Sequence, residues 1–560
     1  MSRRSLSRCY RILRGSYVRS PDSGPSRIAT LARVLFRVAI FIGWGYLLLR
    51  ALATFGPTSD INNVDFNSDS AIPVLMANDG RPITIFNFYY YGADRWGGWP
   101  FLPMQVAGRV TGYEWTAQSI YAVQAGWLFV GALAIAGLSR RDGLVAGLAY
   151  LIALCLDPDG RYLIFELSQV YAWQTTALLL SWWALRRFFD RQQAAREGRS
   201  SWTAWAWLLA SCGFSYLAIW SSVASVIFLS LMLALEIVRA WSRQSSPRVS
   251  RPLVTSGTFA AGSVVAATAI ERLQKMAYGR FSLAHYGLPF STEFALDTGH
   301  LAENFVIQLR LIATGSWWPL DVLAALLLVA MMAAGLYSVM RKNEAVRHRL
   351  RAALADDTLI LAIAAAGIAA LNFALAVSVS HVRLNGYDSR YLTLTNLFGP
   401  VGGLLTAFLL LKAVVSASRQ RYFETASVVA AMAWLAVAFP KSRLSLEYLE
   451  TEATALALAL KAPHAVLMGD YWATYVFTAL QGDAAMVPVT LEGSFTRTPW
   501  TKETARRANE VILACPRSSR GAPVSPPQTL KQYGRIFTLA DAHWHESRDY
   551  AFALYVRQSR

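Results

Sequence analysis

Long apolar segments dominate the chain between residues 28 and 440, and polar turns separate them. A helix needs about 20 apolar residues to cross a bilayer core of roughly 30 Å. The stretch from Thr203 to Ala240 is too long for one span, so we divide it near Gly213–Ser215. We therefore expect a polytopic α-helical membrane protein with about eleven transmembrane helices. The expected spans are 28–55, 117–138, 143–156, 162–185, 203–217, 219–239, 253–271, 318–340, 357–379, 392–412 and 424–440.

The polar turns alternate in charge, which indicates how the chain crosses the membrane. Alternate turns are rich in arginine, as is the tail at residues 1–27, and basic turns favour the cytoplasmic side. The N-terminus is therefore expected in the cytoplasm and, with an odd number of spans, the C-terminus outside. The basic turns are at residues 140–141, 186–199, 239–251, 341–351 and 412–421.

Composition supports a membrane protein and excludes other classes. The chain is 54% hydrophobic and 16% charged, with a mean hydropathy of +0.32, whereas soluble domains are about 25% charged. The net charge of +18 lies in the basic turns, so we expect membrane lipid and no nucleic acid as a partner. The four cysteines are far apart and form no disulfide or zinc pattern. The apolar run 28–55 is too long for a signal-peptide core and is expected to be a retained anchor.

The pattern changes near residue 462, where short apolar runs begin to alternate with helical stretches. This alternation predicts a small α/β domain at 462–560, outside the membrane. The expected domains are thus a basic tail at 1–27, a transmembrane domain at 28–461 with an outer loop at 56–113, and the domain at 462–560. The outer interval 276–304 leads into an expected surface helix at Leu301–Ile312.

The outer loop 56–113 carries the first group of candidate residues. Asp65 and Asp69 are four positions apart, so a helix would place both carboxylates on one face. Alternatively, Asp69 or Ser70 caps a helix at Ala71–Ala77, since aspartate and serine are favoured N-caps. Aromatic rings follow, among them Tyr91 and Trp96, which would either stack on sugar or form an interfacial belt.

A second group lies in the late outer interval 378–391. Arg383 and Arg390 are suited to phosphate, because a guanidinium donates two parallel hydrogen bonds. Tyr391 follows Arg390 directly, and His381 precedes both arginines. The alternatives are arginines that anchor the chain to lipid headgroups and a histidine that is structural.

The order of these features resembles the GT-C superfamily of membrane glycosyltransferases, which includes protein O-mannosyltransferases and aminoarabinose and arabinosyl transferases. Their first outer loop carries an Asp, often followed by Glu, that leads into a helix. Here Ser68-Asp69-Ser70-Ala71-Ile72 keeps the Asp and lacks the Glu. Ser389-Arg390-Tyr391-Leu392 looks like the Arg-Tyr pair of a late outer loop in that superfamily.

The resemblance implies an enzyme that transfers sugar from a polyprenyl-phosphate donor to a glycan, lipid or protein acceptor. It implies a carboxylate as general base, with Asp69 the first choice, and Asp65 either assisting it or holding a divalent cation such as Mg²⁺ or Mn²⁺. The implied contacts to substrate are Arg390, Tyr391, Arg383, His381, Tyr91 and Trp96. The expected location is the inner membrane of a bacterium, and the domain at 462–560 is assigned no catalysis.

Two other classes remain open. A transporter or flippase of lipid-linked saccharide would bury acids within its spans, for which Glu166 and Glu236 are candidates. A non-catalytic membrane assembly protein would use the first loop only to bind a partner.

Overall fold

The structure is a computed structural model, and it describes much of the chain after residue 67. Two compact units divide the chain, 1–50 and 51–560, and all described residues belong to the second. The expected tail, the anchor at 28–55, Asp65 and Glu166 lie outside the described residues. The described ranges are 68–91, 93–139, 142–156, 164, 167, 169–195, 202–244, 250–287, 295–315, 317–340, 344–387, 389–415, 419–438, 461–480, 487–516, 526–541, 545–546 and 550–558.

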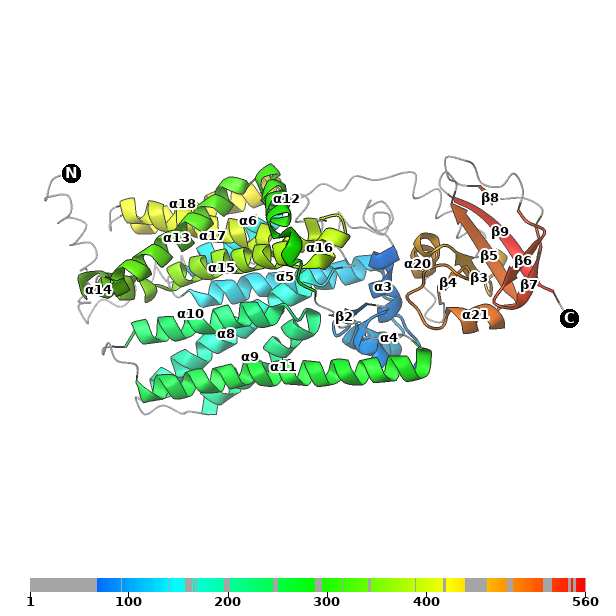
Figure 1. Cartoon of the computed structure of the whole chain (residues 1–560), viewed down its shortest axis with the longest axis horizontal. Coiled ribbons are helices and arrows are strands. Elements are labelled where there is room, and N and C mark those ends of the chain that lie inside the picture. Colours follow the sequence, from blue (N-terminus) through cyan, green and yellow to red (C-terminus); the bar gives the residue numbers. More distant parts are fainter. Residues whose placement is uncertain are drawn as a thin grey trace. The chain divides into compact units, whose positions relative to one another are not determined.

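Helices form most of the described chain, as Figure 1 shows. Seven of them are long and apolar enough to cross a membrane: α5, α9, α10, α11, α13, α15 and the helix formed by η3 and α17. The protein is thus a polytopic helical membrane protein, as predicted. The helices of this region are α5 (Ala117–Leu138), α6 (Gly143–Leu156), α8 (Tyr171–Ala195), α9 (Trp202–Ser221), α10 (Ser225–Ser242), α11 (Arg251–Tyr286), α12 (Leu301–Thr314), α13 (Trp318–Met340), α14 (Glu344–Leu354), α15 (Asp357–Ser378), α16 (Ser380–Leu384), α17 (Thr393–Val414) and α18 (Gln420–Ala438), with 3-10 turns η2 (Thr298–His300) and η3 (Ser389–Leu392).

Four expected spans need correction. The break between α9 and α10 falls at residues 222–224 and not near Gly213, which lies inside α9 with no neighbouring atom within 4 Å of its added Cβ. At the true break the Ser225 hydroxyl donates to the Ala218 carbonyl, 2.8 Å away, and so competes with helical hydrogen bonding. Helix α8 extends ten residues beyond the expected end at 185, and α11 extends fifteen beyond 271.

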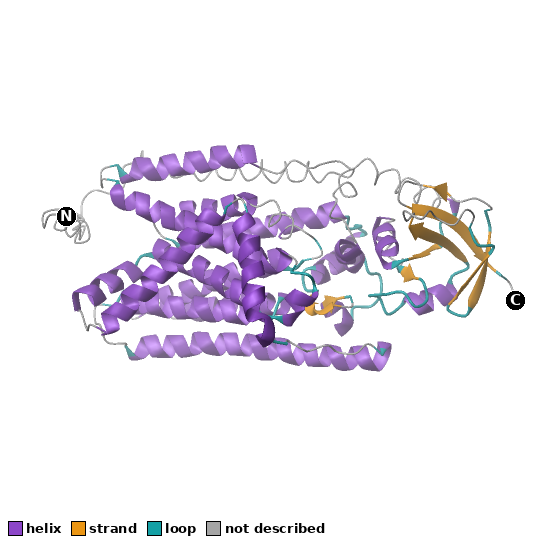
Figure 2. Ribbon diagram, turned by 45° about the horizontal axis from the view of Figure 1, so that its top comes forward, coloured by secondary structure: helices purple, strands orange, loops and turns teal. Residues whose placement is uncertain are grey.

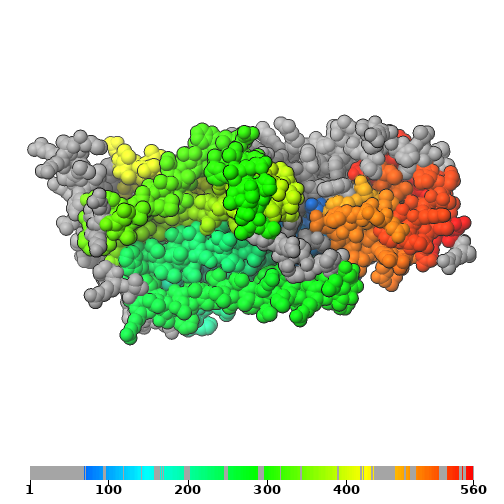
Figure 3. Space-filling view, viewed as in Figure 1, coloured from blue at the N-terminus to red at the C-terminus, as the bar shows by residue number. Residues whose placement is uncertain are grey.

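Helices α8 and α11 continue through charged residues because the structure gives those charges partners. Arg186 of α8 is 3% exposed and its Nε donates to Glu236 of α10 at 2.8 Å. Glu271 of α11 accepts from the hydroxyl of Tyr89 at 3.2 Å. Helix α11 has 36 residues, about 54 Å of helix, and its outer side forms a continuous green strip in Figure 3.

Small residues bring α13 and α17 close together. A Cβ added at Gly403 of α17 would lie 2.3 Å from the carbonyl oxygen of Leu320 in α13. A Cβ at Gly402 would lie 3.2 Å from the Cβ of Ala324. These glycines let the two backbones approach, as small residues do between membrane helices.

Helix α12 confirms the predicted helix at 301–312, and it is amphipathic. Phe305 and Val306 are 46% and 55% exposed, whereas Asn304 and Gln308 are buried. The apolar side therefore faces outward, which is typical of a helix that lies against lipid.

The outer segment after α3 (Ser68–Ala77) folds into short elements that surround a buried aromatic cluster. Its strands pair as an antiparallel hairpin, which Figure 2 shows apart from the other strands. The elements are η1 (Ile85–Phe88), β1 (Tyr89–Tyr90), β2 (Ala93–Gly97) and α4 (Phe101–Thr111).

The C-terminal region contains a mixed sheet with a helix on each face. Strand order is β4-β3-β5-β9-β7-β6, with β8 paired to β9; β3 is parallel to β4 and β5, and the remaining pairs are antiparallel. Ile512 and Ala514 of β5 share one apolar cluster with Phe477, while Val511 and Leu513 point into the other. This alternation confirms the predicted α/β class. The elements are β3 (Val466–Gly469), α20 (Tyr471–Leu480), β4 (Val489–Thr490), α21 (Thr501–Arg507), β5 (Glu510–Pro516), β6 (Thr529–Gln532), β7 (Arg535–Leu539), β8 (His545–Glu546) and β9 (Tyr550–Arg557).

Candidate active site

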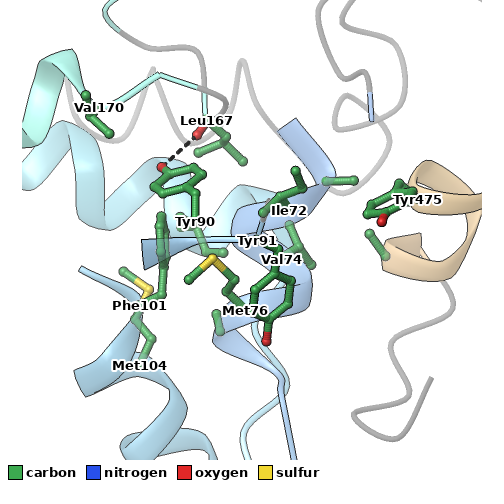
Figure 4. Packing of buried hydrophobic residues seen from close by; sticks show 14 of the residues in the cluster. Ile72, Val74, Met76, Tyr90, Tyr91, Phe101, Met104, Leu167, Val170 and Tyr475 are labelled. Carbon is green, nitrogen blue, oxygen red and sulfur yellow. Dashed lines mark hydrogen bonds between the residues drawn. The ribbon is translucent and has the colours of Figure 1, made fainter. Parts of the chain in front are cut away.

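Helix α3 positions Asp69 in its first turn. The helix begins at Ser68, so Asp69 is a helical residue and not the N-cap that the sequence allowed. Most described side chains of α3 are buried, with Ile72 and Val74 each 2% exposed. Figure 4 shows both beside the aromatic residues of one apolar cluster, to which Tyr475 of α20 also belongs. The packing of α3 against α20 therefore sets which partners Asp69 meets.

Those partners come from the C-terminal region. The hydroxyl of Tyr471 donates to Oδ1 of Asp69, and Nη2 of Arg497 lies 3.4 Å from the same oxygen. Nε of Arg497 also donates to the Tyr471 hydroxyl at 3.1 Å. Burial raises the pKa of Tyr471, and the neighbouring Asp69 charge raises it further. The phenol therefore stays protonated and serves as a donor to the carboxylate.

Aromatic residues contact both the backbone and the side chain of Arg497. The Tyr475 hydroxyl accepts from the backbone N–H of Arg497 at 2.7 Å and from that of Thr498 at 2.8 Å. The guanidinium carbon lies 5.3 Å from the ring centre of Phe495 and 5.9 Å from that of Tyr471. Cation–π contacts of this kind hold an arginine near a ring face. The arginine is therefore set in place by both its backbone and its side chain.

Asp79, another carboxylate of the same segment, has a structural role. Its Oδ2 accepts from the hydroxyl of Tyr91 and, at 3.3 Å, from Asn87 Nδ2. Its Oδ1 accepts from the backbone N–H of Arg81 at 2.9 Å. The Asp79 side chain is 1% exposed, whereas that of Asp69 is 23% exposed. The Asp69 carboxylate is thus accessible to solvent, whereas the Asp79 carboxylate is buried and hydrogen-bonded to neighbouring residues of its own segment.

The aromatic run 86–91 is mostly core, and so is neither an interfacial belt nor an open sugar platform. Phe86 is fully buried, and Tyr91 is 1% exposed with its hydroxyl on Asp79. Tyr90 donates to the carbonyl of Leu167 (Figure 4). Trp96 is partly buried, 5.7 Å from the ring of Tyr90. The buried rings of the run belong to the apolar core next to α3 and β2. The expectation that Tyr91 contacts sugar therefore does not fit its burial.

The second group of candidates does gather around one short segment. His381 and Tyr391 make an edge-to-face contact at 5.9 Å. Arg390 lies 5.1 Å from the Tyr391 ring centre, and its Nη2 donates to the Tyr391 hydroxyl at 3.3 Å. Helix α16 and turn η3 therefore bring together three residues that the sequence singled out.

Arg383 is different, because a carboxylate already matches its charge. Its Nε donates to Oδ2 of Asp297 at 2.6 Å. The hydrogen bond from Arg383, with a second from His300, lowers the pKa of Asp297 to about 2. Arg383 thus links α16 to the segment before α12, which makes it a poor candidate for binding a phosphate.

The described residues do not fit the expected divalent-cation site. Within the described ranges, no three His, Cys, Asp or Glu side chains are grouped as metal ligands. Asp69 has the Arg497 guanidinium beside it, which occupies the place of a cation. Asp65, the residue expected to hold the cation, lies outside the described residues.

Sequence reasoning missed Tyr471 and Arg497 because the C-terminal region was assigned no catalysis. The available signal was a strand end at Gly469-Asp470 followed by aromatic residues, and a polar loop in which Arg497 lies between Phe495 and Trp500. Nothing local in these residues indicates a carboxylate 402 positions earlier.

Comparison with known proteins identifies the fold. No protein-family model and no curated protein sequence matches the chain. Among solved structures, ArnT from Cupriavidus metallidurans in the apo state superposes with a TM-score of 0.51 at 12% identity, covering 94% of this chain and 98% of that one. The chain has a GT-C-like fold. The Archaeoglobus fulgidus oligosaccharyltransferase in the apo form gives a TM-score of 0.41 at 11% identity, over 84% of this chain and 69% of its own.

The GT-C-like fold confirms the resemblance drawn from the sequence. It covers both the helical region and the C-terminal sheet, since nearly the whole of ArnT is matched. Identity this low establishes architecture, and function has to be argued from the site.

Proposed function

We propose that the protein is an integral membrane glycosyltransferase that uses a polyprenyl-phosphate-linked sugar, with Asp69 as general base at the outer face of the membrane. The observation that carries this proposal is the contrast between Asp69 and Asp79. Both are acids of the outer segment, but only Asp69 combines 23% exposure with partners from a second region of the chain. The GT-C-like fold supports the reaction class by analogy.

In the proposed reaction, Asp69 accepts the proton of an acceptor hydroxyl as that oxygen bonds to the anomeric carbon. The bond between this carbon and the phosphate oxygen breaks, and polyprenyl phosphate leaves with the electron pair. Arg390 is proposed to bind this phosphate, where its fork meets the charge that develops on the leaving group. Proton, sugar and phosphate are then all accounted for without a further reactant.

A transporter of lipid-linked saccharide is less well supported. Glu236 was a candidate for a functional acid within a span, and it is fully buried. It accepts from Arg186 Nε at 2.8 Å, Arg239 Nε at 2.7 Å and Trp182 Nε1 at 2.7 Å. Both arginines also lie within 3.6 Å of Asp357. This is a neutralised structural cluster rather than an acid open to cargo.

The substitution Asp69→Asn tests the proposal. It keeps the shape of the side chain, but an amide cannot accept the proton, so we expect turnover to fall by roughly two to four orders of magnitude. Release of polyprenyl phosphate from a defined donor by purified protein is the measurement. Asp65→Asn, made in parallel, shows whether the nearby acid shares the role.

Glu503→Gln is the matched control, since Glu503 is a 60% exposed acid of α21 that pairs with Arg507. It should leave turnover unchanged. Wild-type turnover in the Asp69→Asn protein would remove Asp69 from catalysis, and wild-type turnover in both loop variants would remove the first outer loop.

A further inference from the structure

The contact between Asp69 and the C-terminal region has a specific geometry. Tyr471 and Arg497 both approach the same carboxylate oxygen, Oδ1. Tyr471 fills one lone-pair position of this oxygen with a hydrogen bond, and Arg497 pairs with the same oxygen as a cation 3.4 Å away. An acceptor hydroxyl that used Oδ1 would first have to displace one of them.

Water is poorly suited to make that displacement. Arg497 is an ion-pair partner, rests against two rings, and has its backbone held by Tyr475. A water molecule gains only its own hydrogen bonds, whereas an acceptor with many contacts has binding energy to use for rearrangement. At Oδ1, the contact therefore favours a nucleophile that has binding energy of its own over water.

An exposed ring marks where such an acceptor would meet the contact. Phe495 is 59% exposed, lies 5.1 Å from the ring of Tyr471, and lies under the Arg497 guanidinium. An accessible ring next to a charged group offers the type of surface on which a sugar or another apolar face stacks. Contact with Phe495 would reach Arg497 directly.

We propose that Arg497 is a positioning residue that holds Asp69 in a resting state, and that acceptor binding at Phe495 releases it. This inference rests on the proposed function of Asp69. In the resting state the sugar donor is protected from hydrolysis. In that reaction a water proton would go to Asp69, the water oxygen would bond to the anomeric carbon, and polyprenyl phosphate would leave. Arg497 thus favours transfer over hydrolysis.

The test compares two rates in purified full-length protein: sugar release from the donor to water without acceptor, and transfer to acceptor. In Arg497→Gln we expect the rate of hydrolysis to rise on the order of three- to tenfold, which corresponds to the free energy of one partly buried charge pair. The KM for acceptor should also rise. Tyr471→Phe, which removes the hydroxyl that donates to Oδ1, should shift the ratio in the same direction. Arg497→Lys keeps the charge and should lie between wild type and Arg497→Gln.

Arg507→Gln is the matched control, because Arg507 is 78% exposed and pairs with Glu503 on α21. It should change neither rate. If hydrolysis and transfer fall together in Arg497→Gln, or if their ratio is unchanged, the residue is structural and the proposal is overturned. A wild-type protein that neither transfers nor hydrolyses, like Asp69→Asn, would instead overturn the proposed function.

A second measurement does not depend on activity. The thermal midpoints of Asp69→Asn, Arg497→Gln and the double variant form a double-mutant cycle. Non-additive shifts support the contact between the two side chains. Additive shifts overturn it, whatever the enzyme assays show.

Discussion

Arg383 and Arg390 belong to one short outer segment, yet the fold assigns them different partners. Arg383 is bound to the carboxylate of Asp297, whereas Arg390 donates to the Asn385 side-chain oxygen at 3.4 Å and to Tyr391. Arg383 would have to leave this carboxylate before it could bind a phosphate. At the scale of single residues, Arg383 is therefore a poor phosphate ligand, and phosphate binding by Arg390 stays a prediction.

Replacing Arg390 by lysine tests this assignment. Arg390→Lys keeps the charge but loses the planar fork, so the KM for donor should rise roughly tenfold while the protein stays folded. Titration of donor in the transfer assay is the measurement, with Arg507→Gln as an exposed control. An unchanged KM for donor would assign Arg390 to lipid headgroups instead.

The sequence indicated single residues better than it indicated their partners. Asp69 was selected from its spacing to Asp65 and from the resemblance to the GT-C first loop, and Arg390 and Tyr391 from the resemblance to the GT-C Arg-Tyr pair; these two do lie together with His381. The burial of Tyr91 was missed, because an aromatic run near a span fits either a core or an interface. Tyr471 and Arg497 were missed, because no local pattern encodes a contact across 402 positions.

Elements were predicted well where apolar length decided them and less well where charges intervened. Expected bounds agree with the structure for α5, α6 and α13. They fail for α8, where Arg186 suggested an end but is buried against Glu236. Whether a helix continues through a charged residue depends on the partner which that residue finds on a neighbouring helix. Hydropathy along the sequence carries no information about such partners.

The glycines of α9 and α17 give a matched test at the element scale. A Cβ at Gly403 would meet the Leu320 backbone at 2.3 Å, whereas Gly213 has no atom within 4 Å. Gly403→Ala should therefore cost about 1–3 kcal/mol by overpacking, while Gly213→Ala should be neutral or gain up to about 1 kcal/mol from helix propensity. Thermal unfolding in detergent measures both; equal effects would contradict the close approach of α13 and α17.

The link between α16 and the segment before α12 gives an expected pH dependence. The hydrogen bond from Arg383 lowers the pKa of Asp297 to about 2, below the value of about 3.9 for a free aspartate. A lowered pKa means that the carboxylate's contribution to stability is complete above about pH 4 and is lost as the pH falls through about 2. The unfolding midpoints of wild type and Asp297→Asn should thus differ by a constant amount from pH 7 to about 4 and converge below that. A difference that already shrinks between pH 7 and 5 would contradict the assignment.

At the scale of the whole molecule, two patterns in the sequence predicted the class of fold: repeated apolar spans predicted a helical membrane region, and the change to alternating strands and helices predicted the C-terminal domain. The GT-C-like arrangement was implied only by the resemblance to that superfamily. The C-terminal parts of α8 and α10 and the first turn of α15 add a cluster that neither pattern predicts. In it Arg186, Arg239 and Arg243 meet Glu236, Asp190 and Asp357. The three arginines and three acids balance in charge, and their ion pairs connect the helices that carry them.

Membrane orientation remains a prediction, and reporter fusions test it. The basic turns place Gln192 in the cytoplasm and the C-terminus outside. A reporter that is active only after export should therefore work after Arg560 and fail at Gln192, while a cytoplasmic reporter should show the reverse. The opposite pair of results would overturn the eleven-span topology.

The 402 positions between Asp69 and Tyr471 have a consequence for biosynthesis. Ribosomes add roughly 5–20 residues per second, and domains fold as they emerge. On the proposed function, the general base reaches the membrane roughly 20–80 s before the residues that restrain it. During that time Asp69 has no restraint, so on the proposal made for Arg497 the preference for transfer over hydrolysis begins only when the last part of the chain has been made and has folded against α3.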